Sequence, residues 1–349
     1  MLKTKFGQSK KGQEIYYYSF ENQNKMKFTV SNLGAVMTNL WVPDDKGHLR
    51  DVILGYDSVS AYENNTATFF GAIVGRVANR TQNAQFELMN KTYHLNQNEG
   101  NNNLHSGPDG YQIRLWDVKT VDEHKNEISF LLDSPDLDQG YPGDLKLQVT
   151  YRLTEDNQLW ISYKGASNQT TLFNPTSHNY FNLNGHASGT ILDHQLQIAA
   201  SHFTPLKADS IPSGEISKVA ASPMDFRQEK SIGVDITSDF EQIKRAGGYD
   251  HNFVLDKKTD QVETILSLTG DQSHIRLQMA TDMPGLQIYT ANGIDHEKGK
   301  EGAFYPQYAG IALETQYFPN AVNEKNFTTP LLEKDKSVVH QTCLAFSIR

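Results

Sequence analysis

The stretch Leu145-Lys146-Leu147-Gln148-Val149-Thr150-Tyr151-Arg152-Leu153 has an apolar side chain at every odd position and a polar one at every even position. Strict alternation with a period of two is typical of a β-strand with one face on a core and the other on water or a second layer. The turn formers Thr154-Glu155-Asp156-Asn157 come next, and Gln158–Tyr163 has the pattern of a returning strand. This part of the chain therefore predicts an antiparallel hairpin.

Short strands of the same kind recur along the chain between clusters of Gly, Asn, Asp and Pro. We expect them at Phe28–Val30, Val52–Leu54, Ile128–Leu131, Gln195–Ile198, Thr264–Leu268, Ile275–Met279 and Gln287–Tyr289. Helical patterns are few: Ser238–Arg245 has a plausible N-cap and is followed by Gly247-Gly248, and Ser58–Tyr62 could form one turn. Many strands with very little helix predict an all-β protein, a large antiparallel sandwich or barrel. No linker or composition shift divides the chain, so we expect one domain over residues 1–349.

The composition narrows the classes of partner. The chain has 349 residues and a net charge of −9, with 32 Lys and Arg against 41 Asp and Glu, and no basic run. This balance disfavours binding to nucleic acid or to anionic membranes. Residues Met1–Phe6 have no apolar signal core, and no apolar stretch approaches the roughly 20 residues of a membrane helix. We expect a cytoplasmic protein, monomeric or homodimeric.

Several chemistries lack their sequence patterns. Cys343 is the only cysteine, which excludes an intramolecular disulfide and any site built on several cysteines. We find no dinucleotide-binding glycine motif, no phosphate-binding loop, no H-E-x-x-H and no nucleophile elbow. A dedicated metal site is therefore not expected.

Polar residues gather instead in a few segments that a β-protein would place in loops or at strand ends. These are Gly75–Arg80, Asn101–Gly107, Asn174–Leu183, Gly248–Phe253 and Ala312–Gln316. Each segment alone is explained by turn formation or by a structural histidine. Together they supply His, Glu, Asp and Arg, which suit acid and base chemistry on a neutral ligand rich in hydroxyls.

Seven ordered blocks give the chain a family resemblance. They are Phe70–Arg80, Asn103–Gly107, Gly140–Gly143, Asn174–Leu183, Gly248–Phe253, Pro284–Thr290 and Leu313–Gln316. In these blocks the chain resembles the galactose mutarotase (aldose 1-epimerase) family nearly end to end. The resemblance implies a single large antiparallel β-sandwich, the mutarotase supersandwich, which agrees with the strand pattern.

The resemblance also implies roles for individual residues. It assigns Glu314 as general base and His178 as general acid, with Arg80, His105, Asp250 and Gln287 holding sugar hydroxyls and Asn79 next to the site. The chain departs from the family pattern at three flanking positions. Ser106 stands where Gly is usual, and Ser177 and Asn179 stand where Asn and Ser or Thr are commoner. These changes remove no catalytic group but could alter sugar preference.

The implied reaction interconverts the α and β anomers of galactose or glucose and needs no cofactor. A base removes the proton of the C1 hydroxyl while an acid protonates the ring oxygen, so we expect the two groups on opposite sides of the bond that opens. For His178 to be protonated at neutral pH, we expect a carboxylate or carbonyl at its second ring nitrogen. Tyr180, Phe181 or Trp41 could stack on the sugar.

Other functions remain open at this point. A disaccharide such as maltose could be the substrate. A glycoside hydrolase or lyase could use Asp250 and Glu314 as paired carboxylates, although His178 would then have no role. A carbohydrate-binding protein would need no acid–base pair. A sugar-phosphate epimerase is disfavoured, because no cluster of Lys and Arg lies near the matching blocks.

Overall fold

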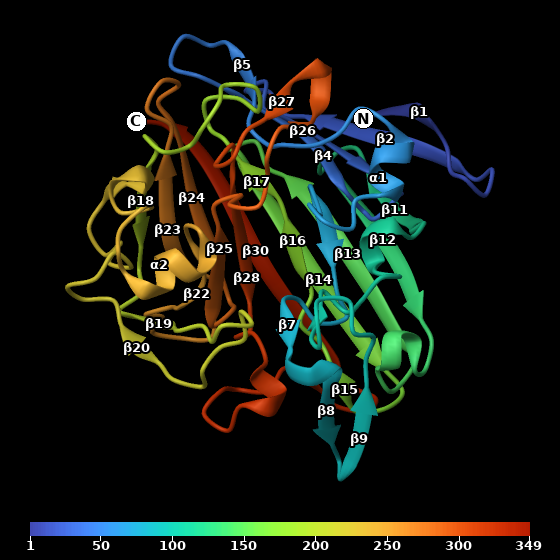
Figure 1. Cartoon of the computed structure of the whole chain (residues 1–349). Helices are drawn as coiled ribbons and strands as arrows, with labels where there is room; N and C mark the ends of the chain where they lie inside the picture. The colour runs from blue at the N-terminus through green and yellow to red at the C-terminus, as the bar shows by residue number, and fades with distance from the viewer.

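A nine-stranded antiparallel sheet is the largest element of the computed structural model, which describes residues 1–349. Its strands in spatial order are β11 (Asp117–Asp122), β12 (Glu127–Ser134), β13 (Leu145–Leu153), β14 (Gln158–Ser167), β30 (Ser337–Ile348), β24 (Ile275–Thr281), β23 (Glu263–Thr269), β18 (Gln195–Ile198) and β21 (Lys230–Ser231). The predicted hairpin is β13 and β14, and the odd positions of β13 are buried from end to end. The longest strand, β30, runs through the middle of the molecule (Figure 1).

Two smaller antiparallel sheets accompany it. The five-stranded sheet contains β1 (Leu2–Gln8), β2 (Glu14–Glu21), β3 (Lys27–Ser31), β4 (Met37–Pro43) and β5 (Leu49–Asp51) in chain order. The six-stranded sheet has the order β17 (Tyr180–Phe181), β28 (Ile311–Gln316), β25 (Gly285–Tyr289), β22 (Asp250–Val254), β19 (His202–Thr204) and β20 (Ser217–Lys218). Figure 1 shows the five-stranded sheet beside β11–β13 and the six-stranded sheet beside β23 and β24.

One apolar core joins the three sheets. A cluster of 55 buried residues includes Phe28 of β3, Tyr151 of β13 and Leu313 of β28. The rings of Phe28 and Tyr151 lie 6.3 Å apart between the five-stranded and nine-stranded sheets. The large sheet is therefore one layer of a β-sandwich and the two smaller sheets form the other, as predicted. This cluster runs from Tyr18 to Phe346, and one domain over residues 1–349 stays a prediction.

Helices are short and few. The structure has α1 (Val59–Glu63), α2 (Glu241–Ala246) and 3₁₀ turns at Gln82–Ala84, Tyr111–Ile113, Asp138–Gly140, Ile232–Val234, Lys300–Gly302 and Ala321–Asn323. The single turn predicted at Ser58–Tyr62 is α1, which Ser58 caps by accepting from the N–H of Ala61. The N-cap predicted at Ser238 is wrong, because α2 starts after Phe240 and has no side-chain cap. Neither helix has the length or apolar character to cross a membrane.

The strand predicted at Val52–Leu54 is also wrong. The strand β5 ends at Asp51, and the next residues bond to two different partners. Val52 donates to Leu40, whereas Leu54 donates to Tyr180, so the segment crosses between sheets and cannot extend one ladder. Its apolar residues are buried because it crosses the interior, which a period-two pattern does not distinguish from a strand.

Five two-stranded ladders complete the fold. They are β6 (Ala72–Val74) with β16 (Thr176–His178), β7 (Arg80–Thr81) with β10 (Asn103–Leu104), β8 (Gln85–Leu88) with β9 (Lys91–His94), β15 (Thr171–Leu172) with β29 (Leu331–Leu332), and β26 (Glu297–Lys298) with β27 (Phe304–Tyr305). The first two bring loop residues next to the six-stranded sheet. Thr176 of β16 donates from Oγ1 to the carbonyl of Thr315 in β28 at 3.0 Å, which fixes these two strands side by side.

The burial of β13 gives a stability prediction. Leu147 has no exposed surface and lies in the shared core, so Leu147→Ala should lower the free energy of unfolding by about 2–5 kcal/mol. The neighbouring Lys146 has a side chain that is 68% exposed and pairs with Asp133, and Lys146→Ala should cost at most about 1 kcal/mol. Chemical denaturation followed by circular dichroism measures both. Equal costs would contradict the assignment of the odd face of β13 to the core.

Candidate active site

Glu314 provides a buried carboxylate on β28, the second strand of the six-stranded sheet. All residues of β28 are buried, and Leu313 belongs to the main core. Because side chains alternate along a strand, Glu314 lies on the opposite face of the sheet. Its side chain is 2% exposed, and its Oε2 atom has no hydrogen-bond partner. Burying a carboxylate in this way costs free energy, so Glu314 marks a candidate functional site.

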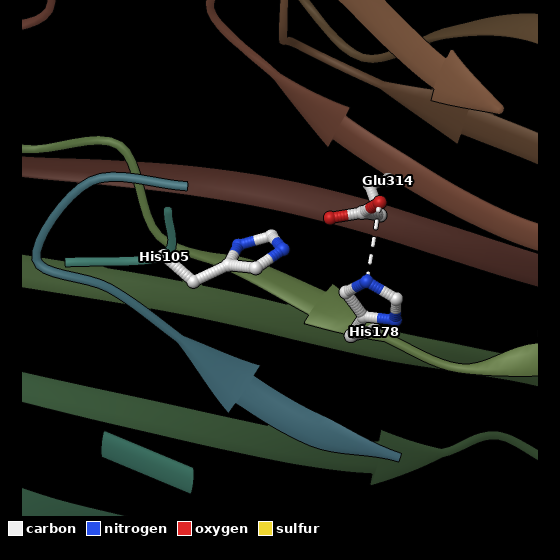
Figure 2. Close-up of side chains that lie close together, drawn as sticks. All are labelled: His105, His178 and Glu314. Atoms are coloured by element: carbon white, nitrogen blue, oxygen red, sulfur yellow. Dashed lines mark ion pairs between the residues drawn. The ribbon is translucent and has the colours of Figure 1, made fainter. Parts of the chain in front are cut away.

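His178 lies beside Glu314 although the two are far apart in the sequence. It is the last residue of β16, whose contact with β28 fixes its position. Its Nε2 atom is 3.5 Å from Oε1 of Glu314, as Figure 2 shows with a dashed line. An imidazole and a carboxylate at this distance can exchange protons with one bound group.

His105 enters the same space from a loop, directed toward the other two side chains (Figure 2). Its ring centroid is 5.2 Å from that of His178, and its Nδ1 accepts a hydrogen bond of 3.1 Å from the backbone N–H of Asn79. Since Nδ1 accepts, the proton of the neutral ring is on Nε2. His105 therefore presents an N–H donor, which suits a hydroxyl or ring oxygen.

The loop that carries His105 is held in an uncommon backbone conformation. The φ angles of Phe69, Asn79, His105 and Ser106 are +53°, +60°, +49° and +70°, in the left-handed region that non-glycine residues seldom adopt. Ser106 compensates for the missing glycine, because its hydroxyl donates to the carbonyl of Val77 and accepts from the N–H of Val77. Phe69, Asn79 and His105 line the same hollow, although left-handed residues also occur in turns elsewhere in the chain.

Arg80 and Asp250 form the charged side of the hollow. Arg80 Nη1 lies 3.6 Å from Oδ2 of Asp250, and Asp250 Oδ1 accepts a hydrogen bond of 2.6 Å from Nε2 of Gln287. The rest of the Arg80 guanidinium binds Glu99, through Nε at 2.6 Å and Nη2 at 2.8 Å. Burial opposes the charge of Arg80, but Asp250 and Glu99 together raise its pKa and keep it a cation.

These side chains line a cavity of about 200 Å³. This is below the roughly 300–1,000 Å³ of sites for drug-sized ligands and suits a single sugar ring. The lining residues are Ala67, Phe69, Asn79, Arg80, Glu99, Leu104, His105, His178, Tyr180, Asp250, Tyr289 and Glu314. Six of the seven residues that the family resemblance selects are among them, and the seventh, Gln287, binds Asp250. The fold therefore brings the whole predicted set together.

The structure separates the three aromatic candidates. Tyr180 lines the cavity, whereas Phe181 belongs to the main core. Trp41, on β4, lies under the ammonium group of Lys27. Phe69 and Tyr289 also line the cavity. Sequence reasoning missed both of these residues, and it missed Glu99. No motif marks a lone acid in an Asn-rich loop, although Phe69 directly precedes the first matching block.

Burial decides the protonation of the central pair. It raises the pKa of Glu314 to about 8, with the Asp250 carboxylate raising it further and Arg80 opposing. Burial lowers the pKa of His178 to about 4. Between these pH values the pair holds one proton. The carboxylate or carbonyl that we expected at the second nitrogen of His178 is not there, because Nδ1 has no hydrogen-bond partner; the carboxylate that contacts the imidazole is Glu314.

Potential ligand atoms of His105, His178 and Glu314 all lie within 4.8 Å of one another, close enough to meet at one metal ion. The hydrogen bond from Asn79 to Nδ1 places a proton on the atom of His105 that faces the cavity. A protonated nitrogen cannot ligate a metal. That leaves one imidazole and one carboxylate, fewer than the three or four protein ligands of zinc sites, and the donor set does not fit a metal centre.

The fold and the site define a class: β-sandwich proteins with an imidazole and a carboxylate in contact in one small polar cavity. The family model described as "Aldose 1-epimerase" matches residues 16–345. Galactose mutarotase of Sus scrofa is 38% identical over 326 residues, covering 93% of this chain and 92% of that protein. Aldose 1-epimerase of Escherichia coli is 33% identical, covering 91% of each. The crystal structure of galactose 1-epimerase from Lactobacillus acidophilus superposes with a TM-score of 0.87 at 28% identity, covering 99% of this chain and 98% of that one.

The chain therefore belongs to the aldose 1-epimerase family.

The raised pKa of Glu314 predicts a pH-dependent cost in stability. The folded protein binds this proton up to about pH 8, whereas the unfolded chain releases it near pH 4.3. Stability is therefore lost as the pH rises from the unfolded pKa through the folded one. Glu314→Gln removes the charge, so it should be more stable than the wild type at pH 8.5 and similar to it at pH 4.5. Thermal unfolding at both values measures this, and a variant that is less stable at pH 8.5 would contradict the assignment.

Proposed function

We propose that the protein is an aldose 1-epimerase that interconverts the α and β anomers of galactose or glucose, with Glu314 as base and His178 as acid. The observation that carries the proposal is the 3.5 Å contact of these two side chains in a sugar-sized cavity. The relatives named galactose mutarotase and aldose 1-epimerase support the choice of reaction.

The reaction uses the pair in both directions. Glu314 takes the proton of the C1 hydroxyl while His178 gives a proton to the ring oxygen, so the bond from C1 to the ring oxygen breaks and an open-chain aldehyde forms. Rotation about the bond between C1 and C2 presents the other face of the aldehyde. His178 then removes the proton from the C5 hydroxyl as its oxygen attacks C1, and Glu314 returns a proton to the C1 oxygen. The pair ends as it began, with no net gain or loss of protons.

One shared proton is what this cycle requires. The reactive form, with Glu314 ionised and His178 protonated, has the same number of protons as the form with a neutral acid and a neutral imidazole. Burial disfavours charge on each group, so before a sugar binds, both groups are neutral and the proton is on Glu314. A sugar hydroxyl that contacts Glu314 and a ring oxygen that contacts His178 give the charged form its hydrogen-bond partners.

The remaining polar groups hold the sugar in place. Arg80 and His105 offer N–H donors, while Asp250 accepts from hydroxyls and is oriented by Gln287. Asn79 acts through its backbone N–H, which sets the tautomer of His105. A site built to pair with hydroxyls rejects analogues that lack them. Tyr180, Phe69 and Tyr289 supply apolar surface for the face of the ring.

Two alternatives have less support. A glycoside hydrolase would use Asp250 and Glu314 and leave His178 without a role, yet His178 contacts Glu314. A sugar-binding protein needs no acid–base pair. Maltose or another disaccharide as substrate, a cytoplasmic location, and a monomeric or homodimeric state stay predictions.

Mutarotation of fresh α-galactose and α-glucose, followed by polarimetry, tests the proposal. The wild type should accelerate mutarotation well above the spontaneous rate. The Glu314→Gln and His178→Asn variants should each have a rate about 10²–10⁴-fold lower, the usual contribution of one positioned proton transfer. Circular dichroism checks that both variants are folded. A Glu314→Gln variant with wild-type activity would disprove the assignment, and release of reducing ends from oligosaccharides would favour the hydrolase.

The shared proton also predicts the pH profile. The value of kcat/KM should follow a bell with limbs near pH 4 and pH 8, because it reports the ionisations of the free enzyme. Below the lower limb the pair takes up a second proton, and above the upper limb it loses the only one. Initial rates corrected for spontaneous mutarotation give the profile. A profile that keeps rising above pH 9 would show that no proton held by the pair is needed.

A further inference from the structure

Glu99 is the one carboxylate at the cavity without a role in the proposed reaction. It lines the cavity and its side chain is 36% exposed. Both of its oxygens bind Arg80, Oε2 at 2.6 Å from Nε and Oε1 at 2.8 Å from Nη2. Paired, charge-assisted contacts of this kind fix the plane of a guanidinium more firmly than a single hydrogen bond does.

The backbone fixes Glu99 in turn. Residues Glu99 and Asn102 face each other across a two-residue turn, with hydrogen bonds of 3.2 Å and 2.9 Å between their backbones. The first residue of the turn, Gly100, has a φ of +57°, which glycine adopts without strain. After the turn, Leu104 pairs with Arg80 in the ladder of β10 and β7. The segment that carries Glu99 is thus bonded to the strand that carries its partner.

The contact controls which donors of Arg80 face the cavity. Glu99 occupies Nε and one hydrogen of Nη2, so Nη1 keeps both of its hydrogens. Nη1 lies 3.6 Å from Asp250, beyond the range of a hydrogen bond. Arg80 and Asp250 are therefore neighbours that leave each other's hydrogen-bonding sites free. A hydroxyl between them can accept from Arg80 and donate to Asp250.

We infer that Glu99 is a positioning residue for sugar binding, which holds Arg80 away from Asp250 so that both keep a free site for the same hydroxyl. The inference rests on the proposed function. Since Glu314 and His178 act at the bond that opens, the hydroxyl held by Arg80 and Asp250 is one other than that of C1.

The charge of Glu99 has a second consequence. Arg80 faces Glu99 and Asp250, and it lowers the pKa of Glu314, which burial and Asp250 raise. The other titratable groups near Glu314 are His105, His178, Tyr163 and Tyr180. Without the negative charge of Glu99, the positive charge of Arg80 acts more strongly on Glu314 and lowers its pKa further. The last proton of the Glu314–His178 pair then leaves at lower pH.

The test compares Glu99→Gln, Glu99→Asp and a control, Glu87→Gln. Glu87 is exposed on the nearby strand β8 and has no ion pair or hydrogen bond through its side chain. In Glu99→Gln, Arg80 should turn onto Asp250, which raises KM for galactose by about tenfold, the loss of one charged contact, while kcat changes far less. The alkaline limb of kcat/KM should move to lower pH. Glu99→Asp keeps the charge, so it should keep the limb in place and recover part of the KM, and Glu87→Gln should match the wild type.

The outcomes separate this inference from the proposed function. The role of Glu99 is overturned if the wild type is active and the Glu99→Gln variant has the same KM and the same alkaline limb as the wild type. The role is also overturned if Glu99→Gln and Glu99→Asp lose equally and the limb does not move, because a purely structural role predicts that result.

If the wild type has no mutarotase activity, the proposed function fails. Calorimetric titration with galactose then decides the role of Glu99, with tenfold weaker binding expected in Glu99→Gln and equal binding contradicting it. Should Glu99→Gln fail to fold, Glu99→Asp carries the test through its KM alone, and a wild-type value would overturn the role.

Discussion

The contact between Glu314 and His178 is the constraint on which the rest of the site depends. Burial makes a charge costly on either side chain, so the two hold one proton between them. Only a rigid frame can keep two such groups together away from bulk solvent, and two strands supply it. The side chain of Thr176 binds β16 to the backbone of β28, and the shared core holds β28 in the sandwich.

Around this pair, the site has donors and acceptors on separate supports. His105 comes from a loop in left-handed conformation, Asp250 and Gln287 from neighbouring strands, and Arg80 from a short ladder beside them. Each is oriented by a further hydrogen bond: Asn79 sets the tautomer of His105, and Gln287 binds Asp250. Such support keeps the polar groups directed into the cavity, although they would otherwise form hydrogen bonds with one another.

Much of the fold could be predicted from local pattern. The period of two in β13 and the turn after it correspond to the strands observed, because alternation reports directly which face is buried. The two wrong predictions, one strand and one helix cap, concern segments whose structure alternation does not report. Val52–Leu54 is apolar because it crosses the interior between sheets, and Ser238 has the residue type of a cap without the geometry.

The sequence alone determined the all-β class, the family resemblance and the identity of seven candidate residues, since residue type and order survive in the linear chain. It left three aromatic residues unranked and passed over Glu99. The tertiary structure decided that Tyr180 lines the cavity, that His178 has no carboxylate on its second nitrogen, and that Arg80 is held by Glu99. These facts depend on distance and burial between segments far apart in the chain, and no local pattern encodes the solvent that folding removes from a side chain.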